Sequence, residues 1–328
     1  MIVPDGIDDP ARPSGGNTFD RRVCRGLADA GWTVRVHPVP VASPAALARV
    51  VRALPDGALV LLDGLVASPA PEVLVPEAGR LRMVALVHMP LTDAREGAVL
   101  SAATGVVTTS AWARETLLEL YSLSGDRVHV AEPGVDEAGL APGTADAGAL
   151  LTVGAVIPGK GHDVLLDALA LLNGRRWHCT CVGSLDRDPA FVARLHRRGL
   201  DGRVRFPGPR TEAELDRSYA AADLLVLPSR GETYGMVVTE ALARGLPVVA
   251  AEVGGVPEAL GHGADGARPG LLVPADDPPA LGDALRSWLE DADLRGRLRR
   301  AARERRASLP RWSKTTSVVA DVLAEAAR

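Results

Sequence analysis

The sequence has little cysteine. Its 328 residues include three, Cys24, Cys179 and Cys181. An odd number without metal-site spacing is not the pattern of a disulfide framework or of a cysteine-based zinc site. Cys179 and Cys181 stand two positions apart in a strand-like run, so their side chains would share one face of a strand. We expect both to be buried, reduced thiols.

An excess of basic charge is also lacking. The formal net charge is −4, which gives no general electrostatic footprint for a nucleic acid. The one basic run, residues 295–306, is more typical of a solvated helix face than of a helix on an anionic membrane surface. We therefore predict no nucleic-acid partner and do not favour peripheral membrane contact.

Long apolar runs are absent as well. No uninterrupted run reaches the roughly 18 residues that a membrane-spanning helix needs. The opening residues, MIVPDGIDDP, lack the basic segment and the apolar segment of a secretory signal. We expect a cytoplasmic protein without a membrane span.

Aromatic residues make up only 3% of the chain, whereas hydrophobic residues make up 47%. The apolar residues are mostly Ala, Val and Leu, which suits parallel strands covered by helices on both faces. A length of 328 residues is more than one core usually holds, so two domains of about 150 residues are expected. The composition predicts an α/β fold class.

Strand-like runs alternate with helical patterns along the chain, which is typical of repeated βαβ units. The predicted strands are MIV, WTVRVHPV, ALVLLDG, RMVALVHM, GVVTTS and VHVAEPG in the first half, and LLTVGAV, WHCTCVGS, VRFPG, LLVLPS and LPVVAA in the second. Helical patterns cover residues 17–31, 43–54, 161–172, 189–199, 211–222 and 235–244. A stretch rich in Gly, Ala, Pro and Asp at residues 134–149 divides the halves. We predict two Rossmann-like domains, at residues 1–141 and 148–310.

Two glutamates flank one predicted helix start. In SRGETYGMVVTEALARGLPVVA, residues 229–250, Glu232 lies in a loop after a strand and Glu240 lies inside the next helix, eight positions later. The backbone N–H groups near Gly235 to Val237 offer an anion site that suits a diphosphate. Eight residues at helical rise span roughly 12 Å, about the reach of a nucleotide sugar. A surface loop followed by a solvated helix face would give the same spacing.

Two further loops follow predicted strands. They read IPGKGHD, residues 157–163, and EVGGVPE, residues 252–258. Ligands of open α/β sheets bind beyond the carboxyl ends of the strands. We therefore predict that all three loops converge on one cleft.

These motifs resemble the nucleotide-sugar half of the family 4 retaining glycosyltransferases of GT-B fold. The resemblance rests on Glu232-x7-Glu240, GLPVVA, GGVPE and VGAVIPGKGHDVLLDAL, and it is densest at residues 150–273. It implies that Glu232 holds hexose hydroxyls, that Glu240 holds the nucleotide ribose, and that Lys160 contacts the donor diphosphate together with backbone amides of residues 233–237. The predicted donor-binding residues are Gly15, Gly16, Gly154, Lys160, Gly161, Arg230, Glu232, Thr233, Tyr234, Gly235, Met236, Val237 and Glu240.

The N-terminal half carries less specific marks. PSGGNTFDRRV places Gly15 and Gly16 between the first strand and the first helix, where glycine allows close backbone approach to a ligand. It resembles the family's glycine-rich loop, although a plain flexible turn is the alternative. His88 closes the strand RMVALVHM, where the family commonly has a histidine near the donor sugar; a hydrogen-bonded core histidine is the other interpretation. The predicted catalytic residues are Glu232, Lys160 and His88, and no metal site is expected.

The resemblance also implies two Rossmann-like domains that face a central cleft. Residues 311–328 have an amphipathic pattern with Val319, Val322 and Leu323 on one face. In GT-B proteins such a helix crosses back to the N-terminal domain. We therefore predict that residues 311–328 complete the first domain.

One position departs from the family pattern. The family usually carries an arginine after the glycine of its VG strand end, where this chain has Ala155. The diphosphate would then lack a bidentate partner, and Arg230 or Arg210 are the candidate substitutes.

The resemblance implies an enzyme, a retaining glycosyltransferase. It would move a hexose-type sugar from a nucleotide diphosphate sugar to a hydroxyl or other nucleophile of an acceptor, with a small molecule favoured and no metal or other cofactor. Two alternatives stay open: a GT-B sugar-nucleotide epimerase, and a catalytically silent nucleotide-sugar-binding subunit.

Overall fold

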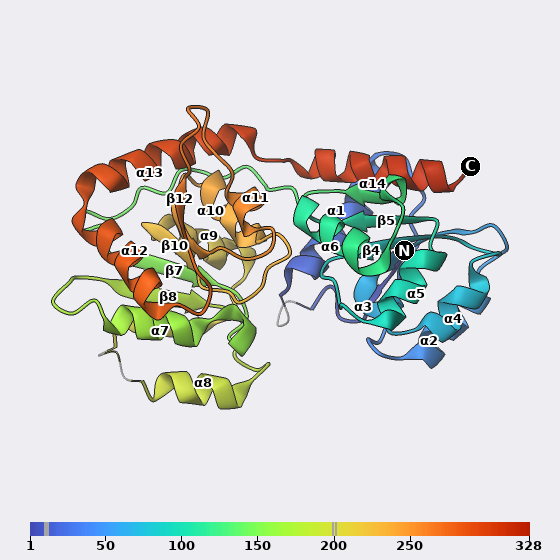
Figure 1. Cartoon of the computed structure of the whole chain (residues 1–328), viewed down its shortest axis with the longest axis horizontal. Helices are drawn as coiled ribbons and strands as arrows, with labels where there is room; N and C mark the ends of the chain where they lie inside the picture. The colour runs from blue at the N-terminus through green and yellow to red at the C-terminus, as the bar shows by residue number, and fades with distance from the viewer. Residues whose placement is uncertain (10–12, 199, 201) are drawn as a thin grey trace. The chain divides into compact units, whose positions relative to one another are not determined.

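The computed structural model describes residues 1–9, 13–198, 200 and 202–328. These residues form two compact units (Figure 1). The first unit contains Met1–Asp9, Gly15–Gly134 and Pro310–Arg328, and the second contains Val135–Leu309 together with residues 13 and 14. Each unit has its own parallel sheet, so the predicted α/β class is confirmed.

The first unit is built on a six-stranded sheet of order β2-β1-β3-β4-β5-β6. Its strands are β1 (Ile2–Pro4), β2 (His37–Val39), β3 (Leu59–Asp63), β4 (Arg82–Val87), β5 (Gly105–Thr108) and β6 (Val128–Val130). Strand β2 is shorter than predicted, because the sequence indicated a strand from Trp32 to Val39. Because β1 has only three residues, the β1–β2 ladder cannot extend further, and Trp32 and Val34 pack against the core outside the strand.

Helices lie between the strands of the first unit. They are α1 (Gly15–Asp29), α2 (Pro44–Arg52), α3 (Gly64–Ala67), α4 (Pro71–Leu74), α5 (Ala94–Ala102) and α6 (Ala111–Tyr121), with short 3-10 turns at Val75–Glu77 and Gly125–Arg127. Helix α1 begins at Gly15, two residues before the predicted start at residue 17. The paired glycines therefore form the first turn of the helix.

The second unit repeats this scheme with a six-stranded sheet of order β12-β11-β10-β7-β8-β9. Its strands are β7 (Ala149–Val153), β8 (His178–Val182), β9 (Val204–Gly208), β10 (Leu224–Leu227), β11 (Val248–Ala251) and β12 (Gly270–Val273). Cys179 and Cys181 on β8 are buried and free, with their Sγ atoms 3.9 Å apart. Strand β10 lies between β7 and β11, and this order brings the loops after all three strands to one edge.

The first four helices of the second unit match the predicted ones closely, whereas those at Val256–Leu260 and Pro278–Glu290 were not predicted. The helices of this unit are α7 (His162–Ala170), α8 (Pro189–His196), α9 (Glu212–Ala220), α10 (Met236–Ala243), α11 (Val256–Leu260), α12 (Pro278–Glu290) and α13 (Ala292–Arg305), with 3-10 turns at Pro158–Lys160 and Arg306–Ser308. The helix predicted to end at residue 199 ends at His196, and residue 199 itself lies outside the described part of the chain. In the described residues no helix has the length and apolar character needed to cross a membrane.

The C-terminal helix α14 (Trp312–Ala326) belongs to the first unit, as predicted. Its residues Val319, Val322 and Leu323 are buried in one core with Phe19 and Val23 of α1. Figure 1 shows this helix in red beside α1. The predicted crossover is therefore confirmed.

The division between the units falls earlier than the sequence suggested. Residues 135–141, predicted to end the first domain, group with the second unit. Ala138 and Ala141 pack against its core, and the backbone N–H of Ala141 donates to the carbonyl oxygen of Arg244. Local composition marked the stretch as a linker, but it is held by these long-range contacts.

We predict that Gly134→Ala destabilises the attachment of α14. A Cβ at Gly134 would lie 2.2 Å from the backbone nitrogen of Trp312 and 2.6 Å from the carbonyl carbon of Arg311, and backbone atoms cannot move aside cheaply. Urea unfolding should show a loss of about 1–3 kcal/mol in the free energy of unfolding. Gly79→Ala in the same unit is the control, because nothing lies within 4 Å of its added Cβ. Equal losses in the two variants would contradict this account of the junction.

Candidate active site

Three loops of the second unit meet at the carboxyl edge of its sheet, as predicted. The backbone N–H of Arg230, after β10, donates to the carbonyl oxygen of Gly159, after β7, over 2.9 Å. The N–H of Gly255, after β11, donates to the carbonyl oxygen of Glu232 over 3.1 Å. These backbone bonds fix the loops to one another before any ligand is bound.

Gly161 is the tightest point of this junction. A Cβ at Gly161 would lie 1.9 Å from the carbonyl oxygen of Pro228, and its φ of +65° lies in the left-handed region that favours glycine. The residue follows the turn Pro158–Lys160 and precedes α7. Only glycine lets the turn that carries Lys160 sit this close to the end of β10.

Lys160 and Glu232 form an ion pair across this junction. The Lys160 Nζ lies 2.5 Å from Glu232 Oε1, which also accepts a hydrogen bond of 2.7 Å from Ser229 Oγ. The two side chains keep 31% and 12% of their surface exposed. The structure thus places a partly accessible cation and carboxylate where a ligand of an open α/β sheet belongs.

Arg230 is held by carboxylates. Its guanidinium donates to both oxygens of Asp163 at 3.0 Å, and its Nε lies 2.6 Å from Asp276. Burial would raise the pKa of Asp163, but the Arg230 hydrogen bonds and charge lower it below its ordinary value. With two acidic partners, Arg230 is a poor substitute for the arginine that Ala155 replaces.

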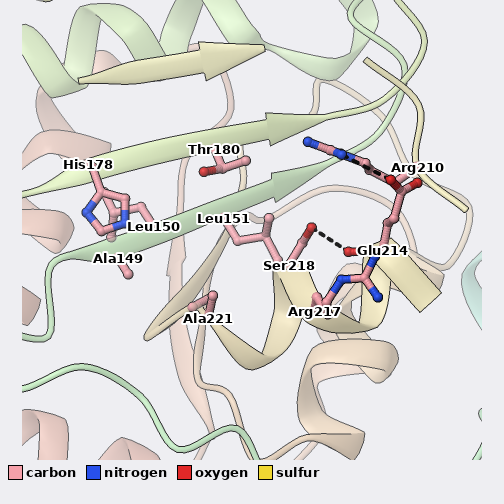
Figure 2. A pocket seen from close by; sticks show the side chains of 11 residues that line it. Ala149, Leu150, Leu151, His178, Thr180, Arg210, Glu214, Arg217, Ser218 and Ala221 are labelled. Carbon is pink, nitrogen blue, oxygen red and sulfur yellow. Dashed lines mark hydrogen bonds and ion pairs between the residues drawn. The ribbon is translucent and has the colours of Figure 1, made fainter. Parts of the chain in front are cut away.

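Arg210 lies elsewhere on the second unit. It pairs with Glu214 of α9 at 3.3 Å and lines a cavity of about 280 Å³ beside that helix (Figure 2). The close-up shows Arg210 and Arg217 toward one end of this cavity and His178 at the other. The residues that line it include none from the three converging loops. This placement does not favour Arg210 as a substitute for the missing arginine either.

Helix α10 begins one residue later than predicted. Gly235 takes a φ of +91° and Met236 is the first helical residue, while the loop residues Thr233 and Tyr234 are buried. The N–H of Val238 already donates to the carbonyl oxygen of Gly235 over 2.8 Å. The helix start with Met236 and Val237 therefore follows the Glu232 loop directly, as an anion site at this place requires.

Glu240 is oriented by a residue that the motifs did not reveal. Its Oε2 accepts a hydrogen bond of 2.7 Å from the buried Tyr219 hydroxyl of α9. Burial raises the pKa of Glu240, against the effects of the Tyr219 hydrogen bond and of Arg244. The Arg244 guanidinium lies 4.6 Å from the centre of the Tyr219 ring. Tyr219 thus fixes the carboxylate predicted to hold the ribose.

Gly154 directly follows β7, beside the Lys160 side chain. Its N–H donates to the carbonyl oxygen of Val182 over 2.8 Å. An added Cβ would lie 3.7 Å from Lys160 Cδ, which is ordinary contact, but its φ of +154° is one that other residues rarely adopt. Ala155 follows directly and is partly exposed.

The first unit has a separate cluster around His88. This residue follows β4, and its Nε2 lies 2.9 Å from Asp20 Oδ1 and 3.2 Å from Asp63 Oδ2. An added Cβ at Gly16 would lie 3.3 Å from the His88 ring, so the Gly15–Gly16 turn packs closely on it. Sequence reasoning found His88 but missed both carboxylates. Asp63 is the last residue of β3, at the carboxyl edge of the sheet where His88 also lies, and that position could have identified it. Asp20 lies inside α1, where no sequence motif marks it.

Known proteins share both the second unit and the whole fold. Residues 147–291 match the family model described as Glycosyl transferases group 1. The second unit belongs to this family. The resemblance seen in its motifs is thereby confirmed, and the residues around Lys160 and Glu232 lie within the group 1 region.

A curated relative is also a glycosyltransferase by name. A D-inositol 3-phosphate glycosyltransferase of Jonesia denitrificans is 36% identical over 246 residues, which cover 68% of this chain and 57% of that protein. The chain thus spans little more than half the length of such relatives.

Solved structures extend the likeness to the whole chain. Sucrose-phosphate synthase (tll1590) from Thermosynechococcus elongatus has a TM-score of 0.77 at 22% identity and covers 99% of this chain and 97% of its own. Anabaena Alr3699/HepE in complex with UDP-glucose has a TM-score of 0.77 at 18% identity and covers 99% of this chain and 98% of its own. The predicted GT-B class, with two Rossmann-like units, is confirmed.

We predict that Gly161→Ala damages the junction of the loops. The new methyl group would meet the Pro228 carbonyl at 1.9 Å in a left-handed backbone, so the Lys160 turn must shift. Unfolding measurements should show a loss of at least about 1–3 kcal/mol. Gly159→Ala in the same turn is the matched control, since nothing lies within 4 Å of its added Cβ. Unchanged stability in Gly161→Ala would show that the contact carries no constraint.

Proposed function

We propose that this protein is a retaining glycosyltransferase. It transfers a hexose-type sugar from a nucleotide diphosphate sugar to a hydroxyl, or another nucleophile, of a small acceptor molecule. The observation that carries the proposal is the Lys160–Glu232 pair at 2.5 Å, set at the carboxyl edge of a group 1 domain. The Lys160 ammonium suits the diphosphate of such a donor, and the Glu232 carboxylate suits its hexose hydroxyls.

The donor would lie along the loop and helix that follow β10. Lys160 and the backbone N–H groups of Met236 and Val237 would face the diphosphate, because a cation and a helix start both attract phosphate oxygens. Glu232 would accept hydrogen bonds from hexose hydroxyls and Glu240 from the ribose. Hydrogen bonds to charged groups of this kind contribute about 1.5–3 kcal/mol each.

Retention would follow from attack on the face that the diphosphate leaves. The bond between the anomeric carbon and the diphosphate breaks, the acceptor oxygen bonds to the same face, and the acceptor proton passes to a diphosphate oxygen. Lys160 and the helix amides would stabilise the charge that develops on the leaving group. We propose that no metal ion or other cofactor takes part.

Two features of known proteins support a sugar donor. The Anabaena neighbour is in complex with UDP-glucose, and the curated relatives are named as glycosyltransferases. UDP-glucose is therefore a sensible first donor to test.

Ala155 favours a second candidate function. Without the family's arginine, and with Arg230 bound by Asp163 and Asp276, a catalytically silent nucleotide-sugar-binding subunit is the main competitor. Incubation with UDP-, GDP-, ADP- and dTDP-hexoses, with and without small acceptors, distinguishes the functions. A product with retained anomeric configuration supports the proposal. An inverted product, an epimerised donor or binding without turnover would each overturn it.

Lys160→Ala should lower kcat/KM by at least about 10²-fold, as loss of one preorganised charge donor typically does. The chain offers a matched control, because its other lysine, the exposed Lys314, lies on α14 in the first unit. Steady-state kinetics of Lys160→Ala and Lys314→Ala make the comparison. Near-normal turnover in Lys160→Ala would show that the diphosphate does not bind at this site.

Glu240→Ala should weaken binding of the free nucleotide roughly tenfold to a hundredfold, which corresponds to about 1.5–3 kcal/mol. Tyr219→Phe should weaken it less, because the carboxylate remains but loses one orienting hydrogen bond. Isothermal titration of both variants measures these affinities. The ribose assignment fails if Glu240→Ala binds nucleotide as well as the unaltered protein does.

A further inference from the structure

The His88 cluster has an unusual hydrogen-bond pattern. Two carboxylates, Asp20 Oδ1 at 2.9 Å and Asp63 Oδ2 at 3.2 Å, face the same ring nitrogen, Nε2. An ionised carboxylate can only accept a hydrogen bond, so Nε2 must carry a proton. The arrangement leaves Nδ1 as the ring atom that can meet a ligand.

Both acidic residues are held rigidly and away from water. Asp20 is 0% exposed on α1, and Asp63 is 1% exposed at the end of β3. Asp63 also accepts a hydrogen bond of 2.7 Å from the N–H of Leu65 and so caps α3. Asp20 Oδ2 is buried without a hydrogen-bond partner among the described residues. Neither carboxylate can turn to solvent to avoid the histidine.

The charge balance decides what Nδ1 does. A histidine beside one buried carboxylate commonly rests neutral and accepts a proton at its second nitrogen. Here two carboxylates surround one imidazole, while the other flank of the ring is formed by the Phe19 ring at 5.2 Å and by Gly16. No cation from these elements contacts the ring in the part of the chain that the structure describes. A proton on Nδ1 is therefore attracted by two negative charges in a site that solvent screens little.

We propose that His88 carries protons on both ring nitrogens through neutral pH and serves as a cationic hydrogen-bond donor to a ligand oxygen, so that it is not a general base. Asp20 and Asp63 are the positioning residues that hold it in this state. The ligand oxygen would belong to a sugar hydroxyl or a phosphate. This role rests on the proposed function, in which the leaving diphosphate, and no side chain, takes the acceptor proton.

The titration behaviour of the cluster agrees with the geometry. Burial alone would lower the pKa of His88, but the Asp20 charge and hydrogen bond, together with those of Asp63, outweigh it and raise the pKa to about 10. Burial raises the pKa of Asp20 to about 6; His88 opposes this rise, and the charge and hydrogen bond of the neighbouring Asp63 add to it. Near pH 7 the histidine is then charged and Asp20 is mostly ionised.

A direct test is an NMR titration of the histidine ring nitrogens in the full chain without substrate. The His88 signals are identified by their loss in His88→Gln. We expect an imidazolium at His88 from pH 6 to pH 8. Asp20→Asn and Asp63→Asn, each of the same shape as the residue it replaces, should each lower the proton affinity of His88 at least about tenfold. Asp56→Asn is the control, because Asp56 is exposed and pairs with Arg80.

Two results would overturn the proposal. One is titration of His88 near its ordinary pKa of about 6.5. The other is selective loss of the His88 signals on addition of a small amount of Mn²⁺, because the three residues could also hold a metal ion. Since the titration needs no substrate, it stands even if glycosyl transfer is never observed. Conversely, observed transfer with a His88 that titrates near 6.5 would leave the proposed function intact and remove only this role.

Discussion

The close approach of Gly161 to the carbonyl oxygen of Pro228 is the contact on which the candidate site depends. It brings the turn after β7 against the end of β10 in a geometry that any side chain would block. The pairing of Lys160 with Glu232, and the bond from Arg230 N–H to Gly159, both lie across this contact. A single backbone constraint thus positions the cation, the carboxylate and the loop that leads to α10.

Ion pairs orient the charged side chains of both units. Lys160 faces Glu232, Arg230 faces Asp163 and Asp276, and His88 faces Asp20 and Asp63. Each side chain is oriented before a ligand arrives, which lowers the entropic cost of binding. The Lys160–Glu232 pair is partly exposed beside the start of α10, where it could exchange partners with a donor, whereas His88 and its two carboxylates are too buried to separate.

Much of the fold could be predicted because its signals are local. Strand runs, the glycines at positions 161 and 235 directly before α7 and α10, and the apolar face of residues 311–328 follow from periodicity and glycine placement. The limits of β2 could not be predicted, because they depend on the length of β1. The place of residues 135–141 could not be predicted either, because it depends on a hydrogen bond to Arg244, over a hundred positions away in the sequence. Glu232, Glu240, Lys160 and His88 stood in recognisable motifs. Their partners Tyr219, Ser229, Asp20 and Asp63 come from other elements or carry no motif, so only the folded chain brings them into view.

The proposed function requires that the loops after β7 and β10 bind a nucleotide diphosphate sugar. A crystal structure of the chain with UDP-glucose, or with whichever nucleotide sugar binds best in titration, tests it most directly. We expect the diphosphate against Lys160 and the N–H groups of Met236 and Val237, with the ribose on Glu240 and the hexose on Glu232. A diphosphate bound elsewhere, such as in the cavity lined by Arg210, Arg217 and His178, would contradict it.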